Sequence, residues 1–498
     1  MANTVQAEAL SPASSPATTL SRRAKPWRNW SGAVQFSPQH VAAPTSVGEL
    51  QGIVRDVAAR GGQLRVAGSG HSFTPLVQTD DTLLTLNGLS GIERIDGHVA
   101  RIRAGTSLKD LGPELARRGF GMTNLGDINK QALAGAVSTG THGTGQTLGA
   151  LHSYVTALRL VTPRGEVIDC SRTQRPEIFD AARVSLGSLG VITQFSVQNV
   201  PTHKLKRRVW LEPIDALVER FDELAEANHS FEIYYIPFCS HGVAITINPT
   251  DEAVLPRGVE QDNNAVMEMK KLRDLVGWWP GLRRRLMDLA TRDFQPEEAV
   301  DVWYRVFPSS REVRFNEMEY HLPREALLAA FKQVRARVEA NHNEEFFPIE
   351  LRVVRGDDAW LSPFHGHDKS ASIAVHRYHK EDPLPYFADI EPIEARKLHL
   401  ARVLGALRTA AHCHGARLAR PGPGEGAVPR GRPHEPAPVA GRLPRGARPP
   451  RLAVGGRGEA DPHAERRLRR RLGVRGERLR GRGAGAERGR RGRQRDHP

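Results

Sequence analysis

The chain has 498 residues, enough for two domains, because a single hydrophobic core stops growing at about 250 to 300 residues. Its net charge of +15 would suggest a nucleic acid or an anionic membrane as partner. However, positions 401–498 contain 25 Arg, no Lys and 8 Asp or Glu, whereas positions 1–400 contain 46 basic and 48 acidic residues. The main body is therefore slightly acidic, which excludes a basic nucleic-acid-binding body.

The cysteines and the apolar runs indicate the compartment. Cys170, Cys239 and Cys413 show neither the pairing of a disulfide framework nor the spacing of a zinc module. Arg22 and Arg23 lack the apolar run that an export signal needs after them, and no stretch approaches about 18 uninterrupted apolar residues. We therefore expect a cytoplasmic protein without a transmembrane segment.

The first part of the chain predicts a leader and an α/β domain. Residues 1–26 are rich in Ala, Ser, Thr and Pro without apolar periodicity, which is typical of disorder. Ser46 and Glu49 predict a helix start, and apolar residues at helical spacing follow from Leu50 to Ala58. Residues 27–203 predict one domain, with a helix near 108–115 and strands at 63–67, 82–86, 92–96, 98–103, 154–161, 166–170 and 191–200.

Residues 204–393 predict a second, α+β domain. A helix is expected from Leu327 to Val338, and strands are expected at 346–354 and 372–378. From 394 to 498 the composition changes to Arg, Gly, Pro and Ala, without any aromatic residue. Such a segment cannot bury enough apolar area to offset a chain entropy of about 1 to 2 kcal/mol per ordered residue. We expect a disordered tail.

Three glycine-rich stretches lie in the first predicted domain, at residues 68–72, 135–145 and 187–190. Glycine lets backbone N–H groups approach an anion closely, so these loops suit a pyrophosphate, although each alone could be a tight turn. The stretch beginning at Gly68 lacks the third glycine of a dinucleotide fingerprint, and no Gly-Lys-Ser/Thr ending of a phosphate-binding loop occurs. A nicotinamide-binding Rossmann domain and a nucleotide triphosphatase are therefore disfavoured.

An ordered set of motifs runs over residues 27–393. The motifs are Trp27-Arg-Asn-Trp30, Pro44-Thr-Ser46, residues 68–72, Asn124-Leu-Gly126, residues 139–145, Ala181-Ala-Arg183 to Ile192, Arg314 to Tyr320, Glu350-Leu-Arg352, and Gly356-Asp-Asp358 followed by Leu361-Ser-Pro363. This set resembles the vanillyl-alcohol-oxidase superfamily, and within it the gulonolactone, arabinonolactone and alditol oxidases. The resemblance implies an α+β fold, with a two-subdomain FAD-binding domain of the PCMH type at 27–203 and a substrate (cap) domain at 204–393.

The resemblance implies FAD as cofactor and a histidine bonded to the 8α-methyl carbon of the flavin, at the place of His71. The alternative is that His71 only makes a hydrogen bond within its loop. For His142 the family position implies a structural or FAD-contacting role rather than proton transfer. The implied cofactor-binding residues are Gly68, Ser69, Gly70, His71, Ser72, Ser138, Gly140, Thr141, His142, Gly143, Gly145 and Ile192.

Two residues of a predicted strand are the catalytic candidates. Strand alternation places Glu350 and Arg352 on the same face. The resemblance implies that Glu350 orients or polarises the substrate hydroxyl and that Arg352 stabilises negative charge. Without it, a surface ion pair worth at most about 1 kcal/mol would be the preferred interpretation. His376 and Tyr378 are substrate-contact candidates, although the alditol oxidases have a threonine where Tyr378 aligns.

No metal site is predicted. His365, His367 and Asp368 lie close together in the sequence, but three polar residues in a loop are more often a solvated turn. The resemblance implies a small sugar lactone or polyol and an electron acceptor as partners.

The resemblance predicts an FAD-dependent oxidase that removes a hydride from a CH–OH group of a gulono-, galactono- or arabinono-1,4-lactone, or of a related polyol. The hydride goes to flavin N5, with oxygen or another molecule as final acceptor. The family's next segment, Gly-Arg-Pro-His-Trp-Gly-Lys, is not recognisable after Ile393, and Gly431-Arg-Pro-His434 matches only its first four residues.

We hypothesise that residues 394–498 derive from a frameshift, since GC-rich DNA read out of phase gives mainly Arg, Gly, Pro and Ala. Two alternative functions stay open. One is an FAD-binding but catalytically impaired product. The other is a protein whose Arg-rich tail binds a membrane or a nucleic acid, the nucleic acid being disfavoured.

Overall fold

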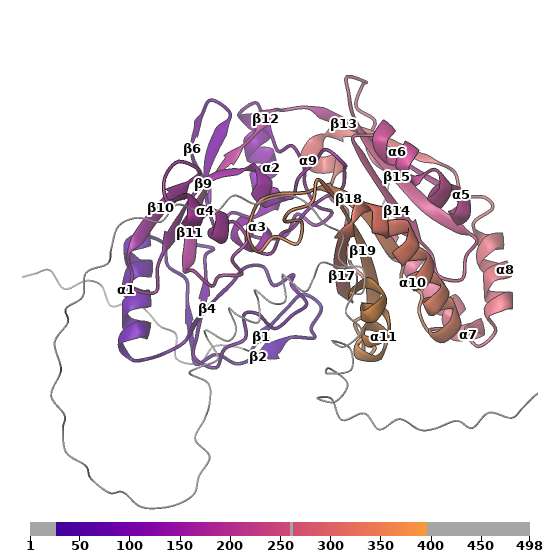
Figure 1. The fold of residues 1–498 in the computed structure, drawn as a ribbon, viewed down its shortest axis with the longest axis horizontal. Coiled ribbons are helices and arrows are strands. Elements are labelled where there is room, and N and C mark those ends of the chain that lie inside the picture. Colours follow the sequence, from indigo (N-terminus) through magenta and orange to yellow (C-terminus); the bar gives the residue numbers. More distant parts are fainter. Residues whose placement is uncertain (1–25, 259–261, 396–498) are drawn as a thin grey trace, which may run out of the picture. The chain divides into compact units, whose positions relative to one another are not determined.

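A computed structural model describes residues 26–258 and 262–395, and all of these residues belong to one unit of the chain (Figure 1). The predicted domain 27–203 falls within the described ranges, as does the predicted domain 204–393 apart from residues 259–261, and their boundary lies between strands β12 and β13. The predicted leader up to residue 25 and the predicted tail from residue 396 lie outside the described residues.

The first helix, α1 (Val47–Ala59), begins as its sequence predicts. The Ser46 hydroxyl accepts a hydrogen bond from the Glu49 N–H at 3.2 Å. The Glu49 carboxylate accepts a hydrogen bond from the Thr45 N–H at 2.8 Å, whereas a capping box would use the Ser46 N–H. The first bond satisfies a donor that a helix start leaves without an intrahelical partner, and the second holds the residue before the N-cap. The buried face of α1 consists of Leu50, Ile53, Val54 and Val57.

Two main sheets form from the first half of the described chain. The parallel sheet has the order β3 (His40–Ala42), β5 (Thr82–Thr85), β4 (Leu64–Ala67). The antiparallel sheet has the order β10 (Val167–Ser171), β9 (Val155–Val161), β11 (Val191–Gln198), β7 (Val99–Arg103), β6 (Ile92–Asp96). Two short pairs are β1 (Trp27–Arg28) with β2 (Gln35–Phe36), and β8 (Phe120–Gly121) with β12 (Val200–Pro201). The helices are α2 (Leu108–Arg117), α3 (Leu133–Ser138), η1 (Leu151–Tyr154) and α4 (Pro176–Ala182).

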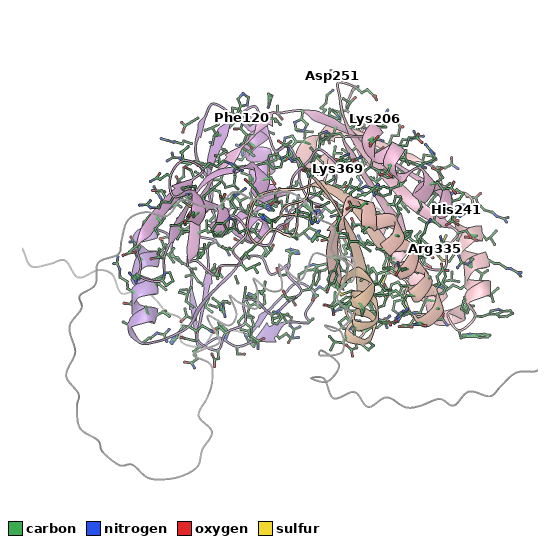
Figure 2. All side chains as sticks on the ribbon, in the orientation of Figure 1. Phe120, Lys206, His241, Asp251, Arg335 and Lys369 are labelled. Atoms are coloured by element: carbon green, nitrogen blue, oxygen red, sulfur yellow. The ribbon has the colours of Figure 1, made fainter. Side chains whose placement is uncertain are left out.

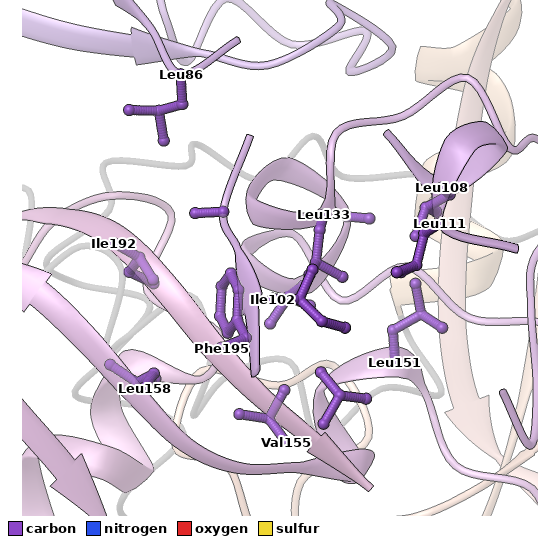
Figure 3. Packing of buried hydrophobic residues seen from close by; sticks show 14 of the residues in the cluster. Leu86, Ile102, Leu108, Leu111, Leu133, Leu151, Val155, Leu158, Ile192 and Phe195 are labelled. Atoms are coloured by element: carbon purple, nitrogen blue, oxygen red, sulfur yellow. The ribbon is translucent and has the colours of Figure 1, made fainter. Parts of the chain in front are cut away.

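One hydrophobic cluster joins these elements. Ile102 of β7, Phe195 of β11 and Leu133 of α3 are almost fully buried within it (Figure 3). The cluster continues into the second half of the chain through residues such as Leu205 and Trp303. The two halves therefore share apolar packing.

The second half forms one seven-stranded antiparallel sheet. Its order is β16 (Glu297–Val302), β13 (Lys204–Pro213), β15 (His241–Thr250), β14 (Ser230–Tyr235), β18 (Ile349–Arg355), β19 (Lys369–Tyr378), β17 (Phe315–Pro323). Its helices are α5 (Ile214–Glu219), α6 (Phe221–Ala227), α7 (Asp262–Val276), α8 (Pro280–Ala290), α9 (Trp303–Val306), η2 (Arg324–Ala326), α10 (Leu327–Asn341) and α11 (Leu384–Ala395).

Strand alternation divides this sheet into two faces. Helices α5, α6, α10 and α11 pack on one face, where Ile233 of β14, Leu351 of β18 and Ile373 of β19 are fully buried. Arg335 of α10 lies on this helix-covered side (Figure 2). The neighbouring residues Glu350 and Arg352 consequently point to the other face, as predicted.

Two predicted strands end differently in the structure. The strand expected at 346–354 begins only at Ile349, because Pro348 has no N–H for a ladder and the Phe346 and Phe347 N–H groups donate to the Glu345 carboxylate. The strand expected at 191–200 breaks after residue 198, and β12 pairs with a different strand. The other predicted strands and helices are confirmed to within a few residues.

Candidate active site

A cavity of about 1070 Å³ lies on the open face of the seven-stranded sheet. Loop residues 71–74, 126–128 and 139–142 line it, together with strands of that sheet and helices α7 and α8. We call its charged part the polar end, formed by Asp127, Arg311, Glu232, Tyr234, Glu350 and Arg352. We call its other part the apolar end, formed by Val209, Leu211, Ile245, Leu286, Met287 and Phe294.

The first glycine loop brings His71 to the cavity wall. Gly70 has a φ of +74°, and a Cβ there would lie 3.0 Å from the Trp27 ring, so only glycine fits without strain. The Trp30 N–H donates to the Gly70 carbonyl at 2.7 Å. The Trp30 ring stacks on the His71 ring, with 5.8 Å between the ring centroids. Burial, with a smaller contribution from Lys130, lowers the pKa of His71. Its buried Nδ1 has no hydrogen-bond partner among the described residues.

The second glycine loop follows α3 and lines the cavity with residues 139–142. Gly140 has a φ of +76°, and a Cβ there would lie 3.2 Å from the Pro363 ring. The loop therefore passes closely under the segment that links β18 to β19. That segment is held by the His152 ring, which contacts the Asp357 carboxylate at 2.7 Å.

The last residues of the second loop contact protein rather than the cavity. The Gly145 N–H donates to the Val353 carbonyl at 2.7 Å, and the Thr144 hydroxyl donates to the Phe231 carbonyl at 2.6 Å. A Cβ on Gly143 would lie 2.4 Å from the Asn124 side-chain oxygen. These contacts attach the loop directly to β14 and β18, the strands that carry the catalytic candidates.

Five other predicted cofactor residues, Gly70 among them, are not in the cavity wall. Gly68 and Ser69 precede the lining residues of the first loop, and a Cβ on Gly68 would lie 3.8 Å from the Gly135 Cα, so the two glycine loops are neighbours. Ser138 ends α3 immediately before the lining residues. Ile192 is buried in the core, on β11 (Figure 3).

Arg352 is the centre of the polar end. Its guanidinium donates to Glu232 at 3.1 Å and to Asp127 at 2.7 Å, and it also contacts Glu350. Glu232 and Arg352 face each other across β14 and β18. Glu350 and Arg352 therefore belong to a buried cluster and do not form a surface ion pair. Buried charged groups need partners that offset the cost of their desolvation.

Tyr234 connects the two carboxylates beside Arg352. Its hydroxyl lies 2.8 Å from the Glu350 carboxylate and 2.9 Å from the Asp127 carboxylate. Because a phenol has one proton, it donates to one carboxylate at a time. The Tyr234 hydroxyl thus lies between the Glu350 and Asp127 carboxylates and can donate to either of them.

The three carboxyl groups of this cluster differ in how strongly they hold a proton. Burial raises the pKa of Glu350, and burial together with Asp127 raises the pKa of Glu232 to about 8. Burial also opposes ionisation of Asp127, but Arg352 and Arg311 outweigh it and lower the pKa of Asp127. The cluster therefore contains one firmly ionised carboxylate and two that hold protons more strongly than free glutamate does.

Glu319 and His321 of strand β17 form, with His142, a second cluster of ionisable side chains in the cavity wall. The His142 ring contacts the Gly143 carbonyl through Nδ1 at 2.7 Å and the Glu319 carboxylate through Nε2 at 3.1 Å. The Gly143 carbonyl and an ionised Glu319 carboxylate both accept hydrogen bonds. Burial lowers the pKa of the neighbouring His321 to about 4.

The two substrate-contact candidates on β19 lie in different surroundings. His376 lines the cavity, and its Nδ1 donates to the Pro348 carbonyl at 2.9 Å. Tyr378 does not line the cavity. It is buried beside Phe346 and Phe347 in an aromatic cluster. Both side chains point to the same face, but Tyr378 is further along the strand.

Sequence reasoning missed Asp127, Glu232 and Tyr234. Asp127 directly follows the motif Asn124-Leu-Gly126, and its place beside that motif was the available indication. Glu232 and Tyr234 alternate with apolar residues on β14, which is the pattern of a strand with one polar face. Alternation alone does not distinguish a cavity from solvent.

Two protein families match the chain. The FAD binding domain matches residues 38–171, and the D-arabinono-1,4-lactone oxidase family matches residues 195–397. The L-gulono-1,4-lactone dehydrogenase of Mycobacterium tuberculosis H37Rv is 35% identical over 373 residues, which cover 74% of this chain and 86% of that protein. The chain belongs to this aldonolactone oxidoreductase family.

Further members and solved structures agree with the assignment. The L-gulonolactone oxidase of Scyliorhinus torazame is 28% identical over 397 residues, which cover 77% of this aldonolactone oxidoreductase and 90% of the Scyliorhinus protein. The crystal structure of cholesterol oxidase from Brevibacterium sterolicum has a TM-score of 0.62 at 16% identity, over 78% of this chain and 86% of that one. The predicted family and the predicted FAD-binding α+β fold are confirmed.

The cavity of this aldonolactone oxidoreductase fits a flavin cofactor. Two glycine loops meet at its edge, and the buried Nδ1 of His71 has no protein partner in the described ranges. Arg352 lies among the carboxyl groups of Asp127, Glu232 and Glu350 and supplies positive charge beside them. Among the described helices, none has the length and apolar character needed to cross a bilayer.

Proposed function

We propose that this chain oxidises a CH–OH group of an aldono-1,4-lactone or a related polyol, using FAD and delivering the electrons to oxygen. Gulono-, galactono- and arabinono-lactones are the proposed substrates. The observation that carries the proposal is the pair Glu350 and Arg352, buried in the wall of a cavity whose rim contains both glycine loops. The names of the two relatives support the substrate class.

We assign the cofactor to residues 27–203 and the substrate contacts to residues 204–393. The proposed FAD-binding residues are Gly68–Ser72 and Ser138–His142, together with the backbone near Ile192, whereas Gly143 and Gly145 support the second loop through their protein contacts. Bound FAD supplies the two-electron acceptor for the hydride. The loops supply backbone N–H groups and hydroxyls, which suit its pyrophosphate.

His71 is the proposed attachment point of the flavin. A lowered pKa keeps its imidazole neutral, and a neutral imidazole is a nucleophile. The absence of a protein partner for Nδ1 in the described part of the chain supports this assignment over a hydrogen bond within the loop.

Glu350 and Arg352 have different proposed roles. Glu350 accepts a hydrogen bond from the substrate hydroxyl, and its raised pKa makes its carboxylate a better proton acceptor than free glutamate. Tyr234 keeps this carboxylate in place through its 2.8 Å hydrogen bond. Arg352 provides positive charge beside the substrate oxygen and stabilises the alkoxide that forms there. His376 is a proposed substrate contact.

The location that we propose is the cytoplasm. Both cysteines in the described ranges, Cys170 and Cys239, are unpaired and buried, which suits a reducing compartment.

Anaerobic reduction of the flavin tests the proposal. Purified protein is mixed with each lactone and with alditols without oxygen, and flavin absorbance is followed before and after air is admitted. Bleaching by a lactone and recovery in air are expected. Glu350→Gln should slow bleaching strongly, whereas Glu223→Gln, on an exposed side chain, should not. Yellow protein that no lactone bleaches would instead support the catalytically impaired alternative.

Acid precipitation tests the attachment. Flavin should remain in the protein pellet of the natural chain and appear in the supernatant of His71→Ala. Flavin that leaves the natural chain on precipitation would remove the covalent part of the proposal and leave the lactone oxidation intact.

A further inference from the structure

Three side chains of the types that bind metals meet beside the cavity. Cys239 belongs to the turn between β14 and β15, His241 is the first residue of β15 (Figure 2), and Asp288 belongs to α8. A thiol sulfur, an imidazole nitrogen and a carboxylate oxygen from these residues lie within 4.8 Å of one another. None of the three residues lines the cavity, so their cluster is separate from the proposed flavin and lactone site.

The hydrogen bonds of this cluster leave the imidazole without a partner. The Cys239 Sγ donates to the Asp288 Oδ1 at 3.5 Å. The His241 Nδ1 lies 3.8 Å from the same oxygen, which is too far for a hydrogen bond. This buried nitrogen has no hydrogen-bond partner among the described residues. A buried polar atom is costly to leave unpaired, so such an atom indicates an ion or a water that completes the site.

The distances in the cluster suit a zinc ion. Zinc binds cysteine sulfur at about 2.3 Å and histidine nitrogen or carboxylate oxygen at about 2.0 to 2.2 Å, in a tetrahedral arrangement. Neighbouring ligand atoms in such a site are roughly 3.3 to 3.7 Å apart. From the Asp288 Oδ1, the Cys239 Sγ at 3.5 Å is within this range and the His241 Nδ1 at 3.8 Å is just beyond it. A small closing movement therefore lets the three atoms share one ion.

The chemical types of the ligands distinguish zinc from the common hard cations. Magnesium and calcium take oxygen ligands, whereas thiolate and imidazole favour zinc and its transition-metal neighbours. One sulfur, one nitrogen and one oxygen therefore select against magnesium and calcium.

The Asp288 carboxylate is oriented by Ser240. The Ser240 N–H donates to Oδ1 at 2.7 Å, and the Ser240 hydroxyl donates to Oδ2 at 2.8 Å. Outer hydrogen bonds of this kind hold the carboxylates of metal sites in place. A carboxylate has about four lone-pair sites. Asp288 therefore has one left for an ion, and it gains a second when the Cys239 thiol loses its proton.

We propose that Cys239, His241 and Asp288 bind one Zn²⁺ ion. The ion replaces the proton of the Cys239 thiol, which passes to the solvent, and a water molecule completes the four ligands. The side chains of His241 and Asp288 are 33% and 30% exposed, so an ion can reach the cluster from solvent. The inference is independent of the lactone chemistry.

The bound ion joins α8 to the turn between β14 and β15. Leu286 and Met287 of α8 and Ile236 before the turn line the cavity, and Cys239 packs in one apolar cluster with Met287 and Ile236. Zinc therefore fixes one part of the cavity wall from behind. The sequence shows no zinc-module spacing here, because Cys239 and Asp288 are 49 positions apart.

Zinc binding by the full chain tests the proposal. Purified protein is freed of metal with a chelator, incubated with Zn²⁺ or Mg²⁺ and passed through gel filtration, and its metal content is measured by mass spectrometry. A parallel sample receives Co²⁺, because a cobalt–thiolate bond gives a charge-transfer band that a difference spectrum separates from flavin absorbance. The ligand variants are Cys239→Ser and Asp288→Asn.

Two cysteine variants are the controls. Cys170→Ser removes the other buried cysteine of the described ranges. Cys413→Ser removes the cysteine that lies between His412 and His414 in the sequence, which is the rival zinc site of the chain.

The natural chain and both controls should retain one Zn²⁺ per chain, show the cobalt–thiolate band and retain no Mg²⁺. Cys239→Ser should lose the band. Both ligand variants should bind Zn²⁺ about 100-fold more weakly or worse, since loss of an outer-shell group alone costs about 10 to 100-fold. Zinc should raise the melting temperature of the natural chain and not that of Cys239→Ser.

Flavin absorbance and the melting temperature without metal should match in all five proteins, which shows that the variants fold. If Cys239→Ser does not fold, the cobalt spectra of Cys170→Ser and Cys413→Ser decide. A band that both of these variants keep must come from Cys239, the remaining cysteine that they share.

Two results would overturn the proposal. One is a natural chain that retains no zinc and shows no cobalt–thiolate band, because a water would then be the partner of the His241 Nδ1. The other is zinc retention that disappears in Cys413→Ser and persists in Cys239→Ser, which would assign the ion to the segment around residue 413.

Discussion

The two ends of the cavity are built on one sheet and differ in how their neighbouring strands face each other. At the polar end, Glu232 of β14 lies directly opposite Arg352 of β18. At the apolar end, Val209 of β13 lies directly opposite Ile245 of β15. Buried charges need partners at fixed distances, whereas apolar contacts have no direction. The polar end should therefore be sensitive to single atoms and the apolar end tolerant.

Replacing the central cation should have the largest effect. Arg352→Lys keeps the charge but loses the fork that reaches Glu232 and Asp127 together. We expect kcat/KM for a lactone to fall by about 100-fold or more, as for removal of a transition-state donor. Arg335→Lys, on the helix-covered face, should change kcat/KM less than twofold. Comparable losses in the two variants would mean that the polar end has no special role.

Removing one phenol should have a smaller effect. Tyr234→Phe deletes the hydrogen bond to Glu350, and we expect kcat to fall about tenfold, or about 1.4 kcal/mol. Tyr235→Phe is the matched control, because its hydroxyl contacts Glu339 on the opposite face of the sheet. Steady-state kinetics of both variants distinguish the faces. An unchanged kcat for Tyr234→Phe would show that Glu350 is held without the phenol.

The polar end should also control how stability depends on pH. Burial raises the pKa of Glu232 to about 8 from 4.5, so the folded protein holds this proton more strongly than the unfolded chain. Its contribution to stability is complete below pH 4.5 and is lost as the pH rises through about 8. In Glu232→Gln the melting temperature should therefore fall less between these two pH values than in the natural chain. An equal change of melting temperature with pH in Glu232→Gln and in the natural chain would contradict this.

Truncation at the apolar end should have the smallest effect. Leu286 borders the cavity, so Leu286→Ala enlarges an existing space, and we expect a loss of about 1 kcal/mol in the free energy of unfolding. Leu217 of α5 is fully buried in a packed core, and Leu217→Ala should cost about 2 to 5 kcal/mol. Urea denaturation measures both. Equal losses would show that the apolar end is packed as tightly as a core.

Sequence patterns were informative where one strand or one loop determines the geometry. The alternation along β18 correctly placed Glu350 and Arg352 on one face, because a strand has a period of two. The glycines at 70 and 140 have the positive φ that glycine loops suggest. The helix start at Ser46 was equally local.

Features that depend on contacts between distant segments could not be predicted. Asp127 meets Arg352 across 225 positions of sequence, and no local pattern connects them. Gly143 and Gly145 belong to a glycine-rich loop, but they serve close approaches of protein to protein. Tyr378 shares the face of His376 and yet lies among aromatic side chains, because the extent of a cavity along a strand depends on what packs against it.

The bond between Thr144 and the backbone of Val353 also bears on how the protein is made. These two residues are 209 positions apart, so the second glycine loop cannot acquire this partner until β18 has been synthesised. At about 5 to 20 residues per second, a ribosome needs roughly 10 to 40 s for that length. During this interval the nascent loop lacks the strand that fixes it. Completion of the proposed cofactor site is therefore a late event in biosynthesis, although most of its residues are translated early.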